Sequence, residues 1–135
     1  MRENAPTAKH LVLVERAVST QNMFKMLLGK MKPGLQVRTF ESHDAAAEHV
    51  EKNPTDVAAL MMNIGTLSEP DAFSLIKRAV KLNAQGHPFP ILAMSANGAH
   101  ETKALETGAD HFVYLGGNFI IKSISPGIEK ALKQV

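Results

Sequence analysis

Six apolar residues in a row fill the centre of the segment Thr55-Asp56-Val57-Ala58-Ala59-Leu60-Met61-Met62-Asn63. Successive side chains of a strand point to opposite faces of its sheet, so a strand of this composition is apolar on both faces. Such strands are typical of parallel sheets that helices cover on both sides. The segment therefore predicts a buried strand in the middle of an α/β sheet.

Four further apolar runs lie before and after this segment. They occupy residues 11–14, 35–40, 91–94 and 112–115. Each run is followed by a segment whose apolar residues recur at helical spacing. Strands and helices thus alternate five times, which predicts a single doubly wound five-stranded parallel sheet, a flavodoxin-like (βα)5 sandwich with right-handed crossovers.

Turn and cap residues mark the ends of the predicted helices. Pro33-Gly34 ends the first helix. Asp71 is expected to cap the N-terminus of the third helix. Ser125 is expected to cap the last helix, with Pro126 at its first helical position.

The length of 135 residues fits one domain. Residues 1–9 are expected to form a flexible tail and residues 10–135 the domain. No window reaches the roughly 18 apolar residues of a membrane-spanning helix, so no membrane contact is expected.

Composition excludes several kinds of chemistry. The chain has no Cys, so it has no disulfide, thiolate metal site or Cys nucleophile, and a cytoplasmic location is expected. The 15 Lys and Arg are scattered and exceed the 13 Asp and Glu by only two, so direct nucleic-acid binding is not predicted. The six histidines are not paired at helical ligand spacing, and glycine-rich phosphate-binding motifs are absent, so neither a metal nor another cofactor is expected.

Ligands of doubly wound sheets bind beyond the carboxyl ends of the strands. In this chain those ends carry Glu15 and Arg16, then Met61 and Asn63, then Ser95. No nucleophile, base and orienting group stand together among them, so the sequence does not predict an enzyme.

The order of these residues resembles that of the receiver domains of two-component response regulators, from about Lys9 to the C-terminus. In that family the fourth strand ends in Thr or Ser followed by Ala, as in Ser95-Ala96, and a Gly-Ala-Asp follows, as in Gly108-Ala109-Asp110. The resemblance implies a CheY-like receiver fold and a role in two-component signalling or a phosphorelay.

Two substitutions affect the chemistry of that family. Its first strand usually ends in two acidic residues that hold Mg²⁺, whereas here Arg16 follows Glu15. Its third strand usually ends in Asp-x-Asn, with the Asp accepting a phosphoryl group, and the corresponding residues are Met61 and Asn63. A thioether cannot form an acyl phosphate, and a guanidinium does not bind Mg²⁺. The sequence therefore predicts a pseudo-receiver without aspartyl phosphorylation.

The family also has a lysine after its fifth strand, which we expect at Lys122 because a Ser-Pro helix start follows it. That choice implies an inserted hairpin over residues 115–121, with a turn at Gly116-Gly117. An ungapped alignment instead places Leu115 at the lysine position. The predicted degenerate phosphorylation pocket consists of Glu15, Arg16, Met61, Asn63, Ser95 and Lys122.

Two interpretations remain open for several of these residues. Arg16 either pairs with Glu15 in place of the missing cation or points to solvent. Met61 either plugs the strand end or belongs to the core. Ser95 is either a switch hydroxyl, with Phe112 as its aromatic partner, or caps the next turn, with Phe112 in the core.

The sequence predicts a signalling module that works through protein contacts, as a monomer or weak dimer. The expected partner is another signalling protein or domain, such as a histidine kinase, an output domain or a regulator. In the family, partners bind the face made by the fourth helix, fifth strand and fifth helix. Here that face is expected to include Lys103, Glu106, Tyr114 and Lys130.

The alternative function is that of a small-molecule sensor. Its apolar strand-end pocket would be lined by Met61, Met62 and Leu67.

Overall fold

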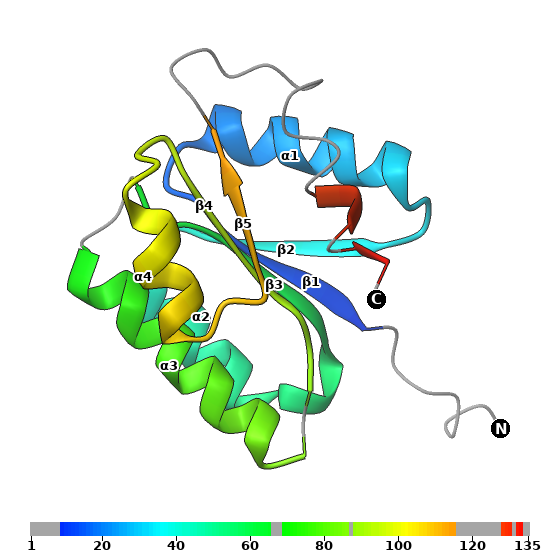
Figure 1. Cartoon of the computed structure of the whole chain (residues 1–135). Helices are drawn as coiled ribbons and strands as arrows, with labels where there is room; N and C mark the ends of the chain where they lie inside the picture. The colour runs from blue at the N-terminus through cyan, green and yellow to red at the C-terminus, as the bar shows by residue number, and fades with distance from the viewer. Residues whose placement is uncertain (1–8, 66–68, 87, 116–127, 131, 134–135) are drawn as a thin grey trace, which may run out of the picture.

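The computed structural model describes residues 9–65, 69–86, 88–115, 128–130, 132 and 133, in which strands and helices alternate along the chain (Figure 1). The elements are β1 (His10–Val14), α1 (Val18–Met31), β2 (Gln36–Phe40), α2 (His43–Lys52), the 3₁₀-helix η2 (Pro54–Asp56), β3 (Val57–Asn63), α3 (Glu69–Ala84), β4 (Ile91–Ser95), α4 (His100–Thr107) and β5 (His111–Tyr114). Residues 128–130 are also helical.

The five strands form one parallel sheet in the order β2-β1-β3-β4-β5. The chain winds outward from β1 in one direction and from β3 in the other, so the topological switch point lies between these two strands. In their register Leu13 lies beside Met61 and Val14 beside Met62. The predicted doubly wound α/β fold is confirmed.

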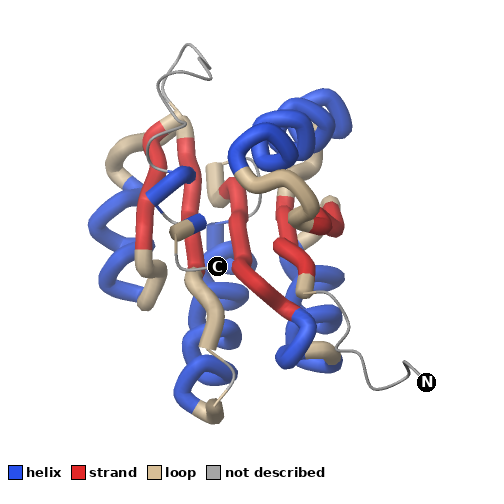
Figure 2. The backbone as a smooth tube through the Cα atoms, turned by 90° about the vertical axis from the view of Figure 1, so that its right-hand side faces the viewer, coloured by secondary structure: helices blue, strands red, loops and turns tan. Residues whose placement is uncertain are grey.

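The central strand β3 contributes to two hydrophobic cores. Leu60 and Met62 pack in the core under α2, α3 and α4, whereas Ala59 and Met61 pack in the core that includes α1 and Ile128. Figure 1 shows α1 on one face of the sheet and α2, α3 and α4 on the opposite face, and Figure 2 shows the strands between the two helical layers. The uninterrupted apolar run of β3 therefore reflects burial on both faces.

The predicted strand boundaries agree with the structure to within one residue, but the start of α3 does not. This helix begins at Glu69, so Asp71 lies within its first turn and is not its N-cap. A carboxylate is favourable at the N-cap and also in the first turn, where it interacts with the helix dipole. An aspartate near a helix start therefore does not show which of the two positions it occupies.

Several predicted features lie outside the described residues. They are the predicted tail, the predicted hairpin over residues 115–121, and the helix start at Ser125 and Pro126. Of the tail only Lys9 is described, and of the hairpin only Leu115. Within the described chain, no helix combines the length and apolar composition needed to cross a membrane.

The turn after α4 requires a glycine for two independent reasons. Gly108 ends the helix with a φ of 127°, a backbone conformation that strains other residues. An added Cβ would also overlap the Cγ2 atom of Val80 on α3. The short connection to β5 therefore depends on the absence of a side chain here.

We predict that Gly108→Ala lowers the free energy of unfolding by about 2–4 kcal/mol, which combines backbone strain with steric overlap. Urea denaturation followed by circular dichroism measures this change. Adding Val80→Ala should remove the overlap but not the backbone strain.

The matched control is Gly29→Ala, because Gly29 lies in α1 and an added Cβ there meets no atom within 4 Å. Alanine is favoured over glycine inside a helix by about 1 kcal/mol, so this variant should be at least as stable as the wild type. Equal effects of the two substitutions would contradict the argument.

Candidate functional site

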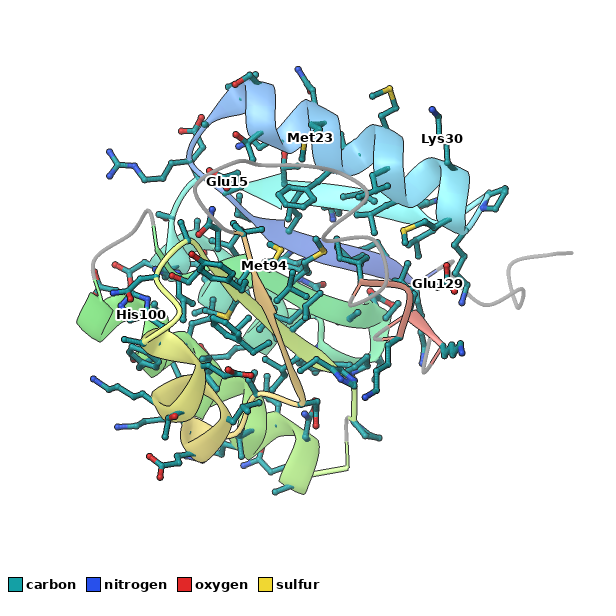
Figure 3. All side chains as sticks on the ribbon, turned by 45° about the horizontal axis from the view of Figure 1, so that its top comes forward. Glu15, Met23, Lys30, Met94, His100 and Glu129 are labelled. Carbon is teal, nitrogen blue, oxygen red and sulfur yellow. The ribbon has the colours of Figure 1, made fainter. Side chains whose placement is uncertain are left out.

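The carboxyl ends of β1, β3 and β4 meet at one edge of the sheet, as the topology requires. Glu15 follows β1 and His100 begins α4, and Figure 3 shows both side chains at this end of the molecule. The candidate site is therefore built from residues of the strand ends and the loops that follow them.

The Glu15 side chain is bound within the chain through both carboxylate oxygens. Its Oε1 accepts a hydrogen bond of 2.7 Å from Nδ2 of Asn63, and its Oε2 accepts one of 3.0 Å from the backbone N–H of Ala17. Its backbone carbonyl accepts a further bond of 2.6 Å from the side chain of Gln21. Because Glu15 is only 1% exposed, these bonds satisfy a carboxylate that water does not reach.

Asn63 joins Glu15 to the loop after β3. Its Oδ1 accepts a hydrogen bond of 3.0 Å from the backbone N–H of Gly65, while its Nδ2 binds Glu15. An added Cβ at Gly65 would lie 2.8 Å from the Ser95 Oγ, so the loop passes close to β4. The strand ends of β1, β3 and β4 are thus connected by direct contacts.

The Ser95 hydroxyl is fully buried and engaged with the turn after β4. Its Oγ accepts a hydrogen bond of 2.9 Å from the backbone N–H of Asn97 and lies 2.8 Å from Nδ1 of His100. Asn97 in turn accepts a bond from the backbone N–H of Ala99. This is the geometry of a side chain that caps a turn.

Met61 lies in the core, two residues before the end of β3. It is 1% exposed and borders a void of about 10 Å³, too little for a ligand. Met62 belongs to the core on the opposite face of the sheet. The expectation that Met61 and Met62 together line one strand-end pocket is therefore wrong, because consecutive strand residues point to opposite faces. Leu67 lies outside the described residues.

The other predicted site residues that the structure describes do not converge on Glu15. Arg16 is exposed, and within the described part of the chain its side chain makes no hydrogen bond or ion pair. Leu115 is buried directly after β5, and its N–H donates to the carbonyl of Ser95 over 2.8 Å. Phe112 is half-buried against the core of α2, α3 and α4. Lys122 lies outside the described residues.

The predicted partner face is mostly exposed, and it contains an apolar residue that the sequence analysis missed. Glu106 and Lys130 are exposed, and Tyr114 is 57% exposed on the edge strand β5. Leu105 on α4 is 42% exposed, a large apolar side chain that its helical spacing did not single out. Lys103 also belongs to α4, but its Nζ lies 4.4 Å from the ring centroid of Phe73 and so points toward α3.

Two histidines from distant parts of the sequence form a pair that was also missed. The Nε2 atoms of His10 and His49 lie 2.7 Å apart, a distance at which one ring donates a hydrogen to the other. Burial lowers the pKa of both, and the nearby Arg38 lowers them further while Asp56 raises them. Among the described residues, no three His, Asp or Glu side chains are grouped as metal ligands.

A third histidine, His43, is buried at the start of α2 with no hydrogen-bond partner for its Nε2 in the described chain. Burial lowers its pKa from 6.5 to about 4, although Asp71 and Asp44 act in the opposite direction. The folded state therefore holds His43 neutral at neutral pH.

Comparison with solved structures shows a receiver fold. The receiver domain of the histidine kinase CKI1 from Arabidopsis thaliana, complexed with Mg²⁺ and BeF3⁻, superposes with a TM-score of 0.72 at 18% identity, over 93% of this chain and 90% of that one. The chemotaxis response regulator CheY4 of Vibrio cholerae has a TM-score of 0.69 at 20% identity, over 93% of this chain and 100% of its own.

The receiver domain of the Saccharomyces cerevisiae response regulator Ssk1, solved together with the histidine phosphotransfer signaling protein Ypd1, gives a TM-score of 0.69 at 16% identity, over 93% of this chain and 92% of that domain. No protein-family model and no curated protein matches the chain. At these identities the likeness establishes the fold, and the chain has the CheY-like fold of receiver domains.

We predict that the free energy of unfolding decreases as the pH falls below 6.5. His10, His43 and His49 have pKa values below 6.5 in the folded state, so in this range the unfolded chain binds more protons. Each histidine contributes a slope of up to about 1.4 kcal/mol per pH unit until the pH falls below its folded pKa. Urea denaturation between pH 7.5 and 4.5 measures the slope.

His43→Leu should reduce that slope, because it removes the titrating group and its unpaired Nε2. Gln36→Leu, at an exposed position of β2, is the neutral control and should leave the slope unchanged. If the free energy of unfolding of His43→Leu depends on pH as steeply as that of the wild type, His43 does not contribute to the pH dependence.

Proposed function

We propose that this chain is a receiver-like signalling module that cannot be phosphorylated and acts through protein contacts. The observation that carries this proposal is the hydrogen bond between Glu15 and Asn63 at the switch point of the sheet. It joins the two strand ends where a receiver would hold its metal and phosphoryl group. Solved receiver domains with the same fold support a role in two-component signalling.

In this proposal, the position in the fold that corresponds to the phosphoryl acceptor is occupied by Asn63 and not by Met61. An acceptor must stand at the strand end, within reach of a phosphoryl donor. Met61 is enclosed in the core, whereas Asn63 ends β3 beside Glu15. Neither side chain has an ionisable oxygen, so neither can form an acyl phosphate, and the proposed loss of phosphorylation does not depend on the alignment.

The Glu15 carboxylate is poorly suited to bind Mg²⁺. Mg²⁺ requires octahedral coordination by oxygen and is usually held by one or two carboxylates. Both Glu15 oxygens already accept hydrogen bonds from the chain, and Asn63 presents an N–H to one of them. Binding the ion would break these buried bonds without a second carboxylate to compensate.

The proposed partner surface lies over α4, β5 and the helical residues 128–130. Leu105 and Tyr114 supply exposed apolar area, and Glu106 and Lys130 supply charges of both signs. Such a mixture is typical of transient protein interfaces. The partner in this proposal is another signalling protein, such as a histidine kinase, an output domain or a regulator, and the module itself performs no catalysis.

We predict that BeF3⁻ with Mg²⁺ leaves the amide resonances of Glu15, Asn63 and Ser95 unshifted in ¹⁵N-HSQC spectra. BeF3⁻ imitates a phosphoryl group on a carboxylate, and the acceptor carboxylate is absent. Saturable shifts of these resonances would overturn the proposal.

Two variants distinguish the acceptor positions. Asn63→Asp places a second carboxylate beside Glu15, so this variant should be less stable without metal and should gain thermal stability as Mg²⁺ is added to millimolar concentrations. Met61→Asp should lose about 3–5 kcal/mol with no recovery in Mg²⁺, because it buries an unpaired charge in the core. Recovery of Met61→Asp instead would place the acceptor at residue 61.

The partner surface can be tested by photo-crosslinking. A photoreactive phenylalanine analogue at Tyr114 should crosslink to one signalling protein, and the same analogue at Val18 should not, because Val18 is equally exposed at 58% but begins α1. The double variant Leu105→Ser/Tyr114→Ala should weaken binding of that protein roughly tenfold or more while changing the free energy of unfolding by less than about 1 kcal/mol. Unchanged affinity would exclude this face.

A further inference from the structure

A cavity of about 440 Å³ lies at the opposite edge of the sheet, where the strands begin. The labelled Lys30 lies toward this end of the molecule in Figure 3, far from Glu15. The cavity is bounded by the start of β1, the turn between α1 and β2, the start of β3 and the segment before β4. The described residues that line it are Lys9, Lys32, Pro33, Gly34, Leu35, Val57, Ala58, Pro88 and Pro90.

One wall of the cavity is a tight turn. The N–H of Leu35 donates to the carbonyl of Lys32 over 3.1 Å, with Pro33 and Gly34 between them. Gly34 has a φ of 90°, so Pro33 and Gly34 occupy the central positions that a type II turn favours for these residues. This wall is held by its own backbone.

The opposite wall is held by hydrogen bonds from two sides. Both groups of the Asn83 side-chain amide bind the backbone of Phe89, which lies between Pro88 and Pro90, over 3.0 Å each. The carbonyl of Pro90 accepts a bond of 2.9 Å from the N–H of Leu60 on β3. A cavity between two restrained walls is preformed, and a preformed site lowers the entropic cost of binding.

The lining combines an apolar surface with positive charge. Leu35 and Ala58 are half-buried aliphatic residues, and among the described residues of the lining the ionisable ones are both cationic, Lys9 and Lys32. Cavities of this volume are in the range of small-molecule sites, in which apolar walls bind the body of a ligand and a few polar groups orient it. The complementary ligand has an aliphatic body and an anionic group.

We propose that this cavity binds a small organic anion with an aliphatic body, such as a medium-chain carboxylate. The ligand contacts segments from four parts of the chain that meet at the beginning of the sheet. The site is separate from the strand-end residues Glu15 and Asn63, so it exists whether or not the proposed signalling function is correct.

Octanoate and octylammonium are the probes, because they share an aliphatic chain and differ in charge. Titration of octanoate into the ¹⁵N-labelled protein below its micellar range should give saturable shifts centred on Leu35, Val57 and Ala58. Octylammonium should cause no saturable shift at these residues. Equal binding of both probes, or octanoate shifts centred elsewhere, would overturn the proposal.

Two variants test the charge and the space separately. Lys9→Gln/Lys32→Gln should weaken octanoate binding roughly tenfold through loss of charge-assisted contacts, whereas Lys25→Gln/Lys30→Gln, which removes the same charge from exposed positions of α1, should not. Ala58→Phe should abolish binding by filling the cavity, since Ala58 is half-buried and lines it. Wild-type affinity in the lysine variant would refute the anionic assignment, and wild-type affinity in a folded Ala58→Phe would refute the location.

Discussion

Burial of β3 on both faces is the constraint from which the rest of the structure follows. A strand that lies between two helical layers must supply apolar side chains to both, and the parallel neighbours β1 and β4 must pair with it in register. The helices are consequently divided between the two faces. The strand ends then meet at one edge, where a hydrogen bond joins Glu15 to Asn63 and Ser95 is bonded to the turn that follows β4.

The sequence predicted the features of the fold that depend on the periodicity of apolar residues. Apolar runs located the five strands to within one residue, and their order along the chain implied the doubly wound sheet. It also identified Glu15, Asn63 and Ser95 as strand-end residues, because the carboxyl ends of parallel strands share one edge. These features depend on local composition and on general rules of topology.

Features that depend on which atoms meet across the fold were not predictable. His10 and His49 lie in different segments, and no spacing rule relates a strand start to a helix interior. His100 follows Ser95 by five residues, but their contact depends on the path of the turn between them. Motif alignment placed Met61 at the acceptor position, whereas the structure encloses it in the core and leaves Asn63 at the strand end. Residues 61 and 63 lie on the same face of the strand because they are two positions apart. The apolar pattern alone therefore cannot tell which of them occupies the acceptor position.

The hydrogen bond between Glu15 and Asn63 has a consequence for how long a signalling response would last. In a phosphorylated receiver, the lifetime of an acyl phosphate sets how long a signal persists. In the module proposed above, a strand end closed by a carboxylate and an amide of the same chain holds no such intermediate to decay. In the proposed module, the duration of a response is then set by the abundance of the protein and by how quickly its partner dissociates.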